Sequence, residues 1–270
     1  MMRLLRQLTS PLRGLPTFLI LGAQKSGTTS LYAALAAHPD VLPSSRKEVH
    51  YFDNHYHRGL LWYRSHFPLR FYQTWLGWMR GRTIHSLEAS PYYLFEPRVA
   101  ARVAQCLPDM RGIVLLRNPI ERAYSHYQHE VRAGREPLSF EEALQAEEIR
   151  LKEEEQKLLA DSRYISPTYG RYSYLARGLY ADQLQRWYGC FARSQILVMQ
   201  SESLFADPEA ALEQITTFLD LRPWKPGTFP KRNTNTYAPI KPEMRARLLA
   251  WFEPHNRRLY DLLGTDFGWQ

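Results

Sequence analysis

The segment FLILGAQKSGTTSLYAAL, Phe18 to Leu35, decides the fold. Its first part, Phe18–Leu21, is an apolar run that predicts a buried strand, and this run ends at Gly22. Apolar residues from Leu31 onward recur with helical spacing, so we expect a helix after the loop. Where a strand, a small-residue loop and a helix meet, free backbone N–H groups and the helix dipole form a binding site for an anion.

The loop departs from the phosphate-binding loop of nucleoside triphosphatases. That loop has the pattern G-x-x-x-x-G-K-[ST], in which the lysine follows the second glycine. Here Lys25 precedes Gly27 by two residues, and Thr28 stands where the lysine should be. The segment therefore predicts a phosphate site of a different type.

Further strand candidates indicate the fold class. They are the apolar runs Gly112–Pro119 and Gln195–Gln200 and the weaker run Thr83–Pro91. Segments with helical spacing lie between them, for instance Val99–Leu107 and Ala210–Leu219. Strands that alternate with helices predict an α/β fold with a P-loop-like central parallel sheet and helices on both faces.

A second loop is expected to meet the first one. In parallel sheets ligands bind beyond the carboxyl ends of the strands, where the loops after Leu21 and Leu116 both lie. A magnesium-dependent nucleoside triphosphatase needs an aspartate near the phosphates, but this strand ends in Arg117. Arg117, with Ser125 on the next helical turn, suits a further phosphate, since guanidinium pairs bidentately and serine donates a hydrogen bond. The alternative is that Arg117 pairs with a buried carboxylate.

Composition bounds the remaining possibilities. The 270 residues predict one domain over residues 1–270, in which residues 1–16 form a basic N-terminal extension. The formal net charge of +8 suits an anionic cofactor or acceptor, a nucleic acid or an acidic membrane surface, and equally an ordinary basic protein. No apolar run approaches the length of a membrane span, so we expect no transmembrane segment. Cys106 and Cys190 are 84 positions apart and form neither a metal-ligand spacing nor a disulfide framework, which favours a reducing, cytoplasmic location.

Several motifs together carry a family resemblance. QKSGTTSL (Gln24–Leu31) resembles the 5′-phosphosulfate loop of sulfotransferases that use 3′-phosphoadenosine 5′-phosphosulfate (PAPS). LLRNPIERAYSHY (Leu115–Tyr127) resembles their 3′-phosphate segment, and KEVHYFD (Lys47–Asp53) resembles the stretch with the catalytic glutamate in heparan sulfate-type and bacterial-like members. Later segments such as Arg177–Trp187 extend the resemblance, which runs from about Phe18 to Tyr237.

The chemistry of sulfuryl transfer assigns roles to the loop. An acceptor atom attacks sulfur in line with the departing phosphate oxygen, which requires a base, hydrogen-bond donors around the sulfonate and a cation at the leaving oxygen. Lys25 would supply the cation, and no metal is expected because the leaving group is already a stabilised phosphate. The expected nucleotide-binding residues are Gln24, Lys25, Ser26, Gly27, Thr28, Thr29, Ser30, Arg117 and Ser125. The resemblance adds Lys231 and Arg232 in a late loop that closes over the nucleotide, although a basic solvent loop is the alternative.

The candidate base lies in RKEVHYFDNHYH. If this stretch is extended, Glu48, His50 and Phe52 share one face. Glu48 is preferred because an ionised carboxylate accepts a proton outright and because the resemblance gives it the catalytic position. His50 is a second base, an orienting group or an acceptor-binding group. Three further residues are candidates for acceptor binding: Lys47, Glu88 and Ser90, the last two in a stretch that resembles the family's acceptor cleft.

Two other functions are weighed against a sulfotransferase. A P-loop-type kinase of nucleotides or small molecules is disfavoured by the displaced lysine and the missing aspartate. A basic module for polyanions, nucleic acid included, would need aromatic residues among clustered cations. Arg163–Tyr180 comes nearest, but such a stretch is more typical of packing.

The resemblance implies PAPS, its product adenosine 3′,5′-bisphosphate (PAP), and a hydroxyl or amine acceptor on a polysaccharide or glycolipid. A small alcohol or a carrier-bound acyl chain stays open. The late loop lacks the cysteines that frame it in Golgi members, which favours a cytoplasmic enzyme.

Overall fold

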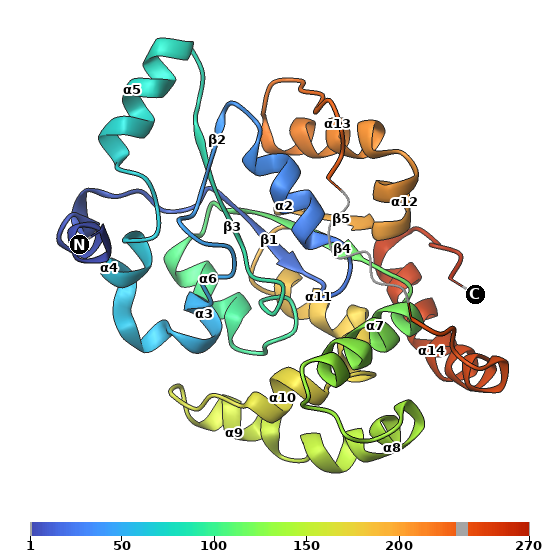
Figure 1. The fold of residues 1–270 in the computed structure, drawn as a ribbon. Coiled ribbons are helices and arrows are strands. Elements are labelled where there is room, and N and C mark those ends of the chain that lie inside the picture. Colours follow the sequence, from blue (N-terminus) through green and yellow to red (C-terminus); the bar gives the residue numbers. More distant parts are fainter. Residues whose placement is uncertain (1, 231–236, 270) are drawn as a thin grey trace.

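The computed structural model describes residues 2–230 and 237–269, and within them a parallel sheet of five strands forms the centre (Figure 1). The strand order is β2-β3-β1-β4-β5, and every neighbouring pair is parallel. The strands are β1 (Phe18–Gly22), β2 (Val41–Pro43), β3 (His85–Ala89), β4 (Arg111–Leu116) and β5 (Ile196–Gln200). Each apolar run singled out in the sequence overlaps a strand, whereas β2, with three residues, is too short to give a pattern.

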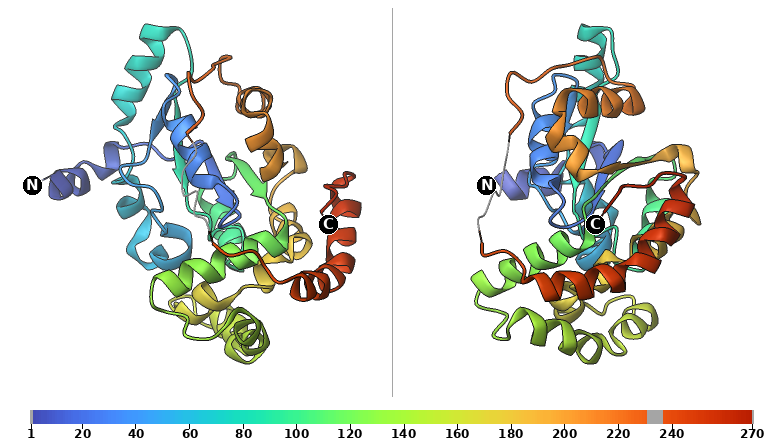
Figure 2. Two further views of the ribbon diagram at one scale, coloured as in Figure 1. Left: turned by 45° about the vertical axis from the view of Figure 1, so that its right-hand side comes forward. Right: turned by 90° about the vertical axis from the view of Figure 1, so that its right-hand side faces the viewer.

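Helices cover the sheet and extend from it. They are α1 (Met2–Leu8), α2 (Thr28–Ala36), α3 (Tyr51–Asn54), α4 (Gly59–Arg64), α5 (Arg70–Arg80), α6 (Val99–Cys106), α7 (Pro119–Arg132), α8 (Phe140–Leu151), α9 (Glu154–Ala160), α10 (Pro167–Tyr172), α11 (Tyr180–Tyr188), α12 (Ser201–Ala206), α13 (Pro208–Leu219) and α14 (Pro242–Leu263). Short 3₁₀ turns are η1 (Ser10–Leu12), η2 (Tyr56–Arg58), η3 (Ala176–Gly178) and η4 (Arg193–Gln195). Helices α7 to α10 lie below the sheet in the views of Figures 1 and 2.

The two faces of the sheet bury separate apolar clusters, because successive side chains of a strand point to opposite faces. Leu19 and Leu21 of β1 pack with residues of α6 and α11, including Trp187. Phe18 and Ile20 pack with residues of α2 and α13. The prediction of an α/β fold with helices on both faces of a parallel sheet is therefore confirmed.

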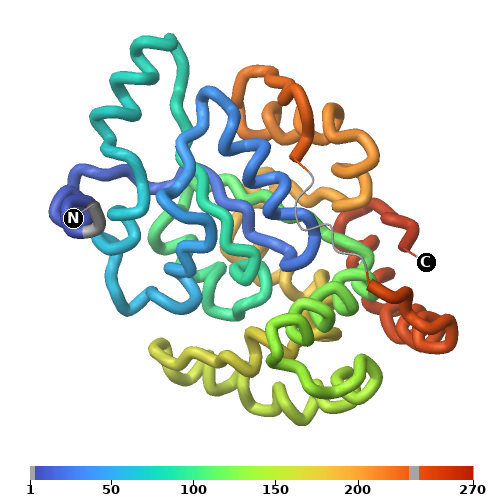
Figure 3. Tube along the Cα trace, viewed as in Figure 1, coloured from blue at the N-terminus to red at the C-terminus, as the bar shows by residue number. Residues whose placement is uncertain are grey.

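Two remaining features concern the chain as a whole. Helix α1 and the C-terminal helix α14 lie on opposite sides of the molecule (Figure 3). Among the described residues, no helix combines the length and the apolar character that crossing a bilayer would require.

Candidate active site

The loop after β1 has a backbone shape that few residues adopt. Lys25 and Gly27 have φ angles of 71° and 86°, in the left-handed region. A Cβ atom on Gly27 would lie 2.7 Å from the ring of Phe205, so both the conformation and the close approach require glycine. The N–H of Ala23 donates to the carbonyl of Leu115 (2.7 Å), which fixes the loop to the end of β4.

The loop leads into the N-terminus of α2 and presents free donors there. Ser30 and Leu31 donate their N–H groups to the carbonyl of Gly27 at 3.0 and 3.1 Å. The N–H groups of Thr28 and Thr29 have no acceptor among the described residues, as expected in the first turn of a helix. Together with the helix dipole, these donors favour an anion at this point.

A cavity of about 830 Å³ opens at the carboxyl ends of the strands. It brings together residues that are far apart in the sequence. The lining includes the following residues predicted from the sequence: Gln24, Lys25, Gly27, Thr28, Thr29, Glu48, Arg117 and Ser125. The cavity therefore joins the strand-to-helix loop, the candidate base and the arginine–serine segment in one space.

Other predicted residues lie outside the lining. Ser26 and Ser30 are fully buried, and the Ser26 carbonyl accepts a hydrogen bond from Ser201 Oγ (2.9 Å), so Ser26 supports the loop from within. Lys47, His50, Glu88 and Ser90 do not line the cavity but connect to Glu48 or its segment, as described below. Lys231 and Arg232 lie outside the described residues.

Sequence reasoning missed several lining residues, among them Glu121, His129, Ser201 and Glu202. Glu121 and His129 are four residues before and after Ser125 on α7, so helical spacing alone places them on its face. Ser201 and Glu202 follow the carboxyl end of β5, the edge at which ligands are expected. Both signals were present in the sequence.

The Lys25 amine forms no ion pair with a carboxylate in the part of the chain that the structure describes. Burial lowers its pKa, and the charges of Arg132 and Arg117 lower it further, whereas the charge of Glu130 raises it. An amine in such surroundings is stabilised by a bound anion, because the anion offsets the repulsion from the neighbouring guanidinium groups.

Arg117 is positioned through the backbone and keeps part of its guanidinium free. Its Nη1 donates to the carbonyl of Lys25 (3.1 Å), which ties the two strand-end loops together. Its ion-pair contact in the described chain is with Glu121, at the long Nη2–Oε2 distance of 4.0 Å. Glu121 is about one-third exposed and also pairs with Arg245, so it is not the buried carboxylate of the alternative considered above.

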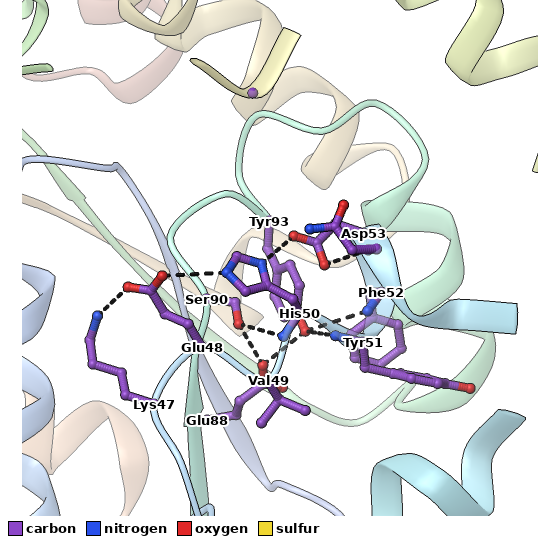
Figure 4. Close-up of polar contacts among 12 residues, drawn as sticks. Lys47, Glu48, Val49, His50, Tyr51, Phe52, Asp53, Glu88, Ser90 and Tyr93 are labelled. Atoms are coloured by element: carbon purple, nitrogen blue, oxygen red, sulfur yellow. Dashed lines mark hydrogen bonds and ion pairs between the residues drawn. The ribbon is translucent and has the colours of Figure 1, made fainter. Parts of the chain in front are cut away.

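The segment with Glu48 is not extended. Glu48 and His50 have φ angles of 59° and 56°, so both adopt the left-handed conformation, and Phe52 is buried in α3. The expectation that the three side chains share a face of an extended segment is wrong. Glu48 and His50 nevertheless meet, because the backbone turns between them and brings the two side chains together (Figure 4).

Lys47 and Asp53 flank the pair of Glu48 and His50 on opposite sides. Lys47 Nζ lies 2.5 Å from Glu48 Oε1, and His50 Nε2 lies 3.4 Å from Glu48 Oε2. On its other side, His50 Nδ1 lies 2.6 Å from Oδ2 of Asp53, whose side chain is buried. Asp53 was not singled out in the sequence, although its spacing of three residues from His50 in KEVHYFD allows the contact.

These contacts set the protonation of both groups. Burial alone would raise the pKa of Glu48, but the hydrogen bond from His50 and the charge of Lys47 outweigh it and lower that pKa to about 2. Burial alone would lower the pKa of His50, but hydrogen bonds to Asp53 and Glu48 raise it to about 10. Near pH 7 the segment therefore holds a carboxylate beside an imidazolium.

A buried carboxyl group supports this strained segment. Glu88 is fully buried and accepts hydrogen bonds from Ser90 Oγ (2.7 Å), Tyr93 Oη (2.8 Å) and the hydroxyl of Tyr63. Ser90 Oγ in turn accepts the N–H of His50 (3.2 Å), as Figure 4 shows. Burial raises the pKa of Glu88, although these donors oppose the shift. Glu88 and Ser90 thus hold the backbone beside the candidate base rather than facing the cavity.

Arg177 orients Gln24 at the other side of the loop. The buried Arg177 side chain donates to Gln24 Oε1 and lies over the ring of Tyr92, 4.7 Å from its centroid. Sequence reasoning noted only the segment that contains it. The contact fixes the Gln24 side chain at the cavity wall.

Comparisons with known proteins agree with this geometry. A solved sulfotransferase from Alicyclobacillus acidocaldarius is 32% identical and superposes with a TM-score of 0.68, covering 94% of this chain and 98% of that one. Membrane-associated sulfotransferase kil1 of Dictyostelium discoideum is 28% identical over 95% of this chain and 67% of its own length. Heparan sulfate glucosamine 3-O-sulfotransferase 3B1 of Mus musculus is 28% identical over 94% of this chain and 65% of its own length.

The chain thus spans about two thirds of the length of these two curated relatives. The family model described as the sulfotransferase domain matches residues 15–231, which include the strand-to-helix loop, Glu48 and Arg117. With most of the sequence matched and the fold shared, the chain belongs to the sulfotransferase family of enzymes.

Proposed function

We propose that this enzyme transfers a sulfuryl group from PAPS to a hydroxyl or amine of a carbohydrate. The observation that carries the proposal is the shared cavity, which is lined by the Lys25 loop, the Arg117–Ser125 segment and Glu48. A carbohydrate acceptor is supported by the mouse relative, whose name refers to heparan sulfate glucosamine. One domain over residues 1–270 and a cytoplasmic location stay predictions from the sequence.

The residues present fit a nucleotide with phosphates at two places. The N–H groups of Thr28 and Thr29 and the Lys25 amine would hold the 5′-phosphosulfate, because these donors line the cavity and none of them has an acceptor or ion-pair partner among the residues that the structure describes. Arg117 and Ser125 would hold the 3′-phosphate, since a guanidinium and a hydroxyl suit phosphate oxygens. Gly27 keeps the loop backbone open to the ligand, as a side chain there would displace Phe205.

Each group has a distinct task in the transfer. PAPS supplies a sulfuryl group whose leaving phosphate is already stabilised. Lys25 neutralises the negative charge that grows at the leaving oxygen, and it does so best in a partly buried site. Glu48 accepts the proton of the acceptor, while His50 and Lys47 hold the carboxylate in place.

The proposal is tested with purified protein, labelled PAPS and a panel of acceptors: an unsulfated glucosamine polysaccharide, a glycolipid and a small alcohol. We expect transfer to the polysaccharide or the glycolipid, and a rate lowered by roughly 10²–10⁴-fold in a Glu48→Gln variant. A separate titration should show tighter binding of PAP than of ATP with magnesium, since a kinase would give the opposite order. Absence of transfer to all acceptors, together with preference for ATP, would contradict the proposal.

A further inference from the structure

Helix α5 turns its apolar face away from the protein. It projects from the body of the molecule in Figure 1 and precedes the amino end of β3, whereas the cavity lies at the carboxyl ends of the strands. Its large apolar residues are exposed on one face: Phe71 (79%), Tyr72 (45%), Trp75 (45%), Trp78 (78%) and Met79 (59%). A surface helix normally buries such residues. The exposed patch therefore indicates an interaction surface.

The polar face of α5 packs on the protein instead. Gln73 Nε2 donates to the carbonyl of Ile84 (2.5 Å), and Gln73 Oε1 accepts from Ser86 Oγ (3.5 Å). Gly77 also faces the protein, because a Cβ atom there would lie 3.7 Å from Cγ1 of the buried Ile84. The hydrogen bonds of Gln73 thus fix the orientation of α5, and the apolar face cannot turn inward without breaking them.

The N-terminal segment adds to this surface. Arg70 Nη2 at the start of α5 donates to the carbonyl of Pro11 (3.1 Å), and Arg6 Nε in α1 donates to the carbonyl of Ser65 (2.8 Å). These bonds hold α1 and η1 on the same side of the molecule as α5, as Figure 1 shows. Four leucines of this segment are more than half exposed: Leu4, Leu5, Leu8 and Leu12.

The sequence around α1 and α5 contains basic residues but no acidic ones. Residues 1–16 and 54–84 contain eight arginines, no lysine and no acidic residue. The rest of the chain then has 27 basic and 27 acidic residues, so these two stretches account for the whole formal charge of +8. Tryptophan, phenylalanine and tyrosine beside arginine are typical of a helix that lies in a membrane interface.

We propose that α5, assisted by α1 and η1, docks this enzyme on an anionic lipid membrane. The aromatic side chains enter the headgroup and acyl boundary, and the exposed Arg70 and Arg82 contact lipid phosphates. A second copy of the chain fits less well, because a symmetric contact through α5 would place the same arginines together without a carboxylate in the stretch to pair with them. The cavity stays open, since it lies at the other end of the strands.

Vesicle co-sedimentation tests this docking. The probes are vesicles of equal parts phosphatidylglycerol and phosphatidylcholine, compared with pure phosphatidylcholine, each at low and high salt. We expect wild-type protein to bind the anionic vesicles more tightly, and salt to weaken that binding. Trp75→Ser with Trp78→Ser should bind at least about tenfold more weakly, since two large apolar side chains are removed. Arg82→Gln should lower the affinity for anionic vesicles by about fivefold.

The matched control is Ile149→Ser with Leu159→Ser, which removes exposed apolar residues of α8 and α9 on another side of the molecule. It should bind as the wild type does, and thermal unfolding should show that all variants are folded. Failure of wild-type protein to bind either vesicle, or full binding by the tryptophan variant, would overturn the proposal. Light scattering that shows a dimer lost in the tryptophan variant, without vesicle binding, would assign the face to a second copy.

Discussion

His50 Nε2 lies 3.4 Å from Glu48 Oε2, and the imidazole is held from its other side by Asp53 at 2.6 Å. A histidine between two carboxylates is stabilised as a cation, which explains why its pKa is raised to about 10 despite its burial. An imidazolium has no free lone pair, so it cannot take a proton near pH 7. The geometry thus favours Glu48 as the base and His50 as the group that orients it.

The first prediction separates these two roles. Glu48→Gln should reduce the rate of transfer by roughly 10²–10⁴-fold, the usual contribution of a general base, while nucleotide affinity is retained. His50→Gln should cost less, because an amide can still donate to Glu48. The measurement is single-turnover transfer from bound PAPS, with His55→Gln as a control in the neighbouring loop. A nearly normal Glu48→Gln enzyme beside an inactive His50→Gln enzyme would reverse the assignment.

The second prediction concerns pH. Lys47 helps to lower the pKa of Glu48 to about 2, so the wild-type carboxylate stays ionised at every pH well above that value. Lys47→Met removes this charge and raises the pKa of Glu48. The fall of kcat/KM on the acidic side should then begin at a higher pH than in the wild type. An unchanged profile of kcat/KM against pH would show that Lys47 does not control the base.

The third prediction concerns how the raised pKa of His50 makes the free energy of unfolding depend on pH. The folded-state pKa of about 10 exceeds the ordinary histidine pKa of 6.5 in the unfolded chain, so the charged His50 stabilises the fold fully below about pH 6.5. This contribution declines as the pH rises through the folded-state value. The difference in unfolding free energy between wild type and His50→Gln should therefore shrink between about pH 6.5 and pH 10. A constant difference, measured by urea denaturation across this range, would mean that His50 is not charged in the folded enzyme.

The parallel sheet and the position of the phosphate loops could be predicted from the local sequence pattern, because the loops that follow parallel strands meet at one edge of the sheet. Apolar runs located four of the five strands, all but the short β2. The rule that ligands bind at the carboxyl ends of parallel strands predicted that Lys25 and Arg117 lie at one edge, where a hydrogen bond of 3.1 Å connects their loops. The expected phosphate loop likewise depends on local geometry, since Gly27 must adopt a positive φ. The strands and the phosphate loop depend on a few neighbouring residues and on the right-handed connections between parallel strands, so the sequence is sufficient to predict them.

The conformation of the Glu48 segment could not be predicted in this way. Its left-handed residues are held by contacts with distant parts of the chain: Glu48 N–H donates to the carbonyl of Ala89 (2.9 Å), and His50 N–H donates to Ser90. The roles of Glu88 and Asp53 depend on the same packing. Alternation in the sequence indicated an extended segment, but tertiary hydrogen bonds overrode that preference.

The fourth prediction tests the role of Lys25. Lys25→Met should reduce the rate of transfer more than it weakens PAP binding, because its charge is needed most when the leaving oxygen becomes negative. Single-turnover rates and PAP titration give the two quantities separately. Arg132→Ala provides the control, since this residue lowers the pKa of Lys25 through its charge but does not line the cavity. Equal losses of rate and of affinity in Lys25→Met would show that Lys25 only binds the nucleotide and does not stabilise the transition state.

The last prediction concerns selectivity for the 3′-phosphate. Wild-type protein should bind PAP more tightly than adenosine 5′-phosphate, because Arg117 and Ser125 line the same cavity as the Lys25 loop and would hold a second phosphate there. A charge-assisted contact of this kind is worth about 1.5–3 kcal/mol, which corresponds to roughly 10-fold to 150-fold in affinity. Arg117→Ala should remove most of that preference, and Ser125→Ala should remove less. Arg132→Ala removes one charge from α7, the helix that carries Ser125. It should therefore weaken the binding of both nucleotides alike and leave the ratio of their affinities unchanged. If calorimetry gave the wild type equal affinity for the two nucleotides, the cavity would not recognise a 3′-phosphate, and the assignment of PAPS as donor would fail.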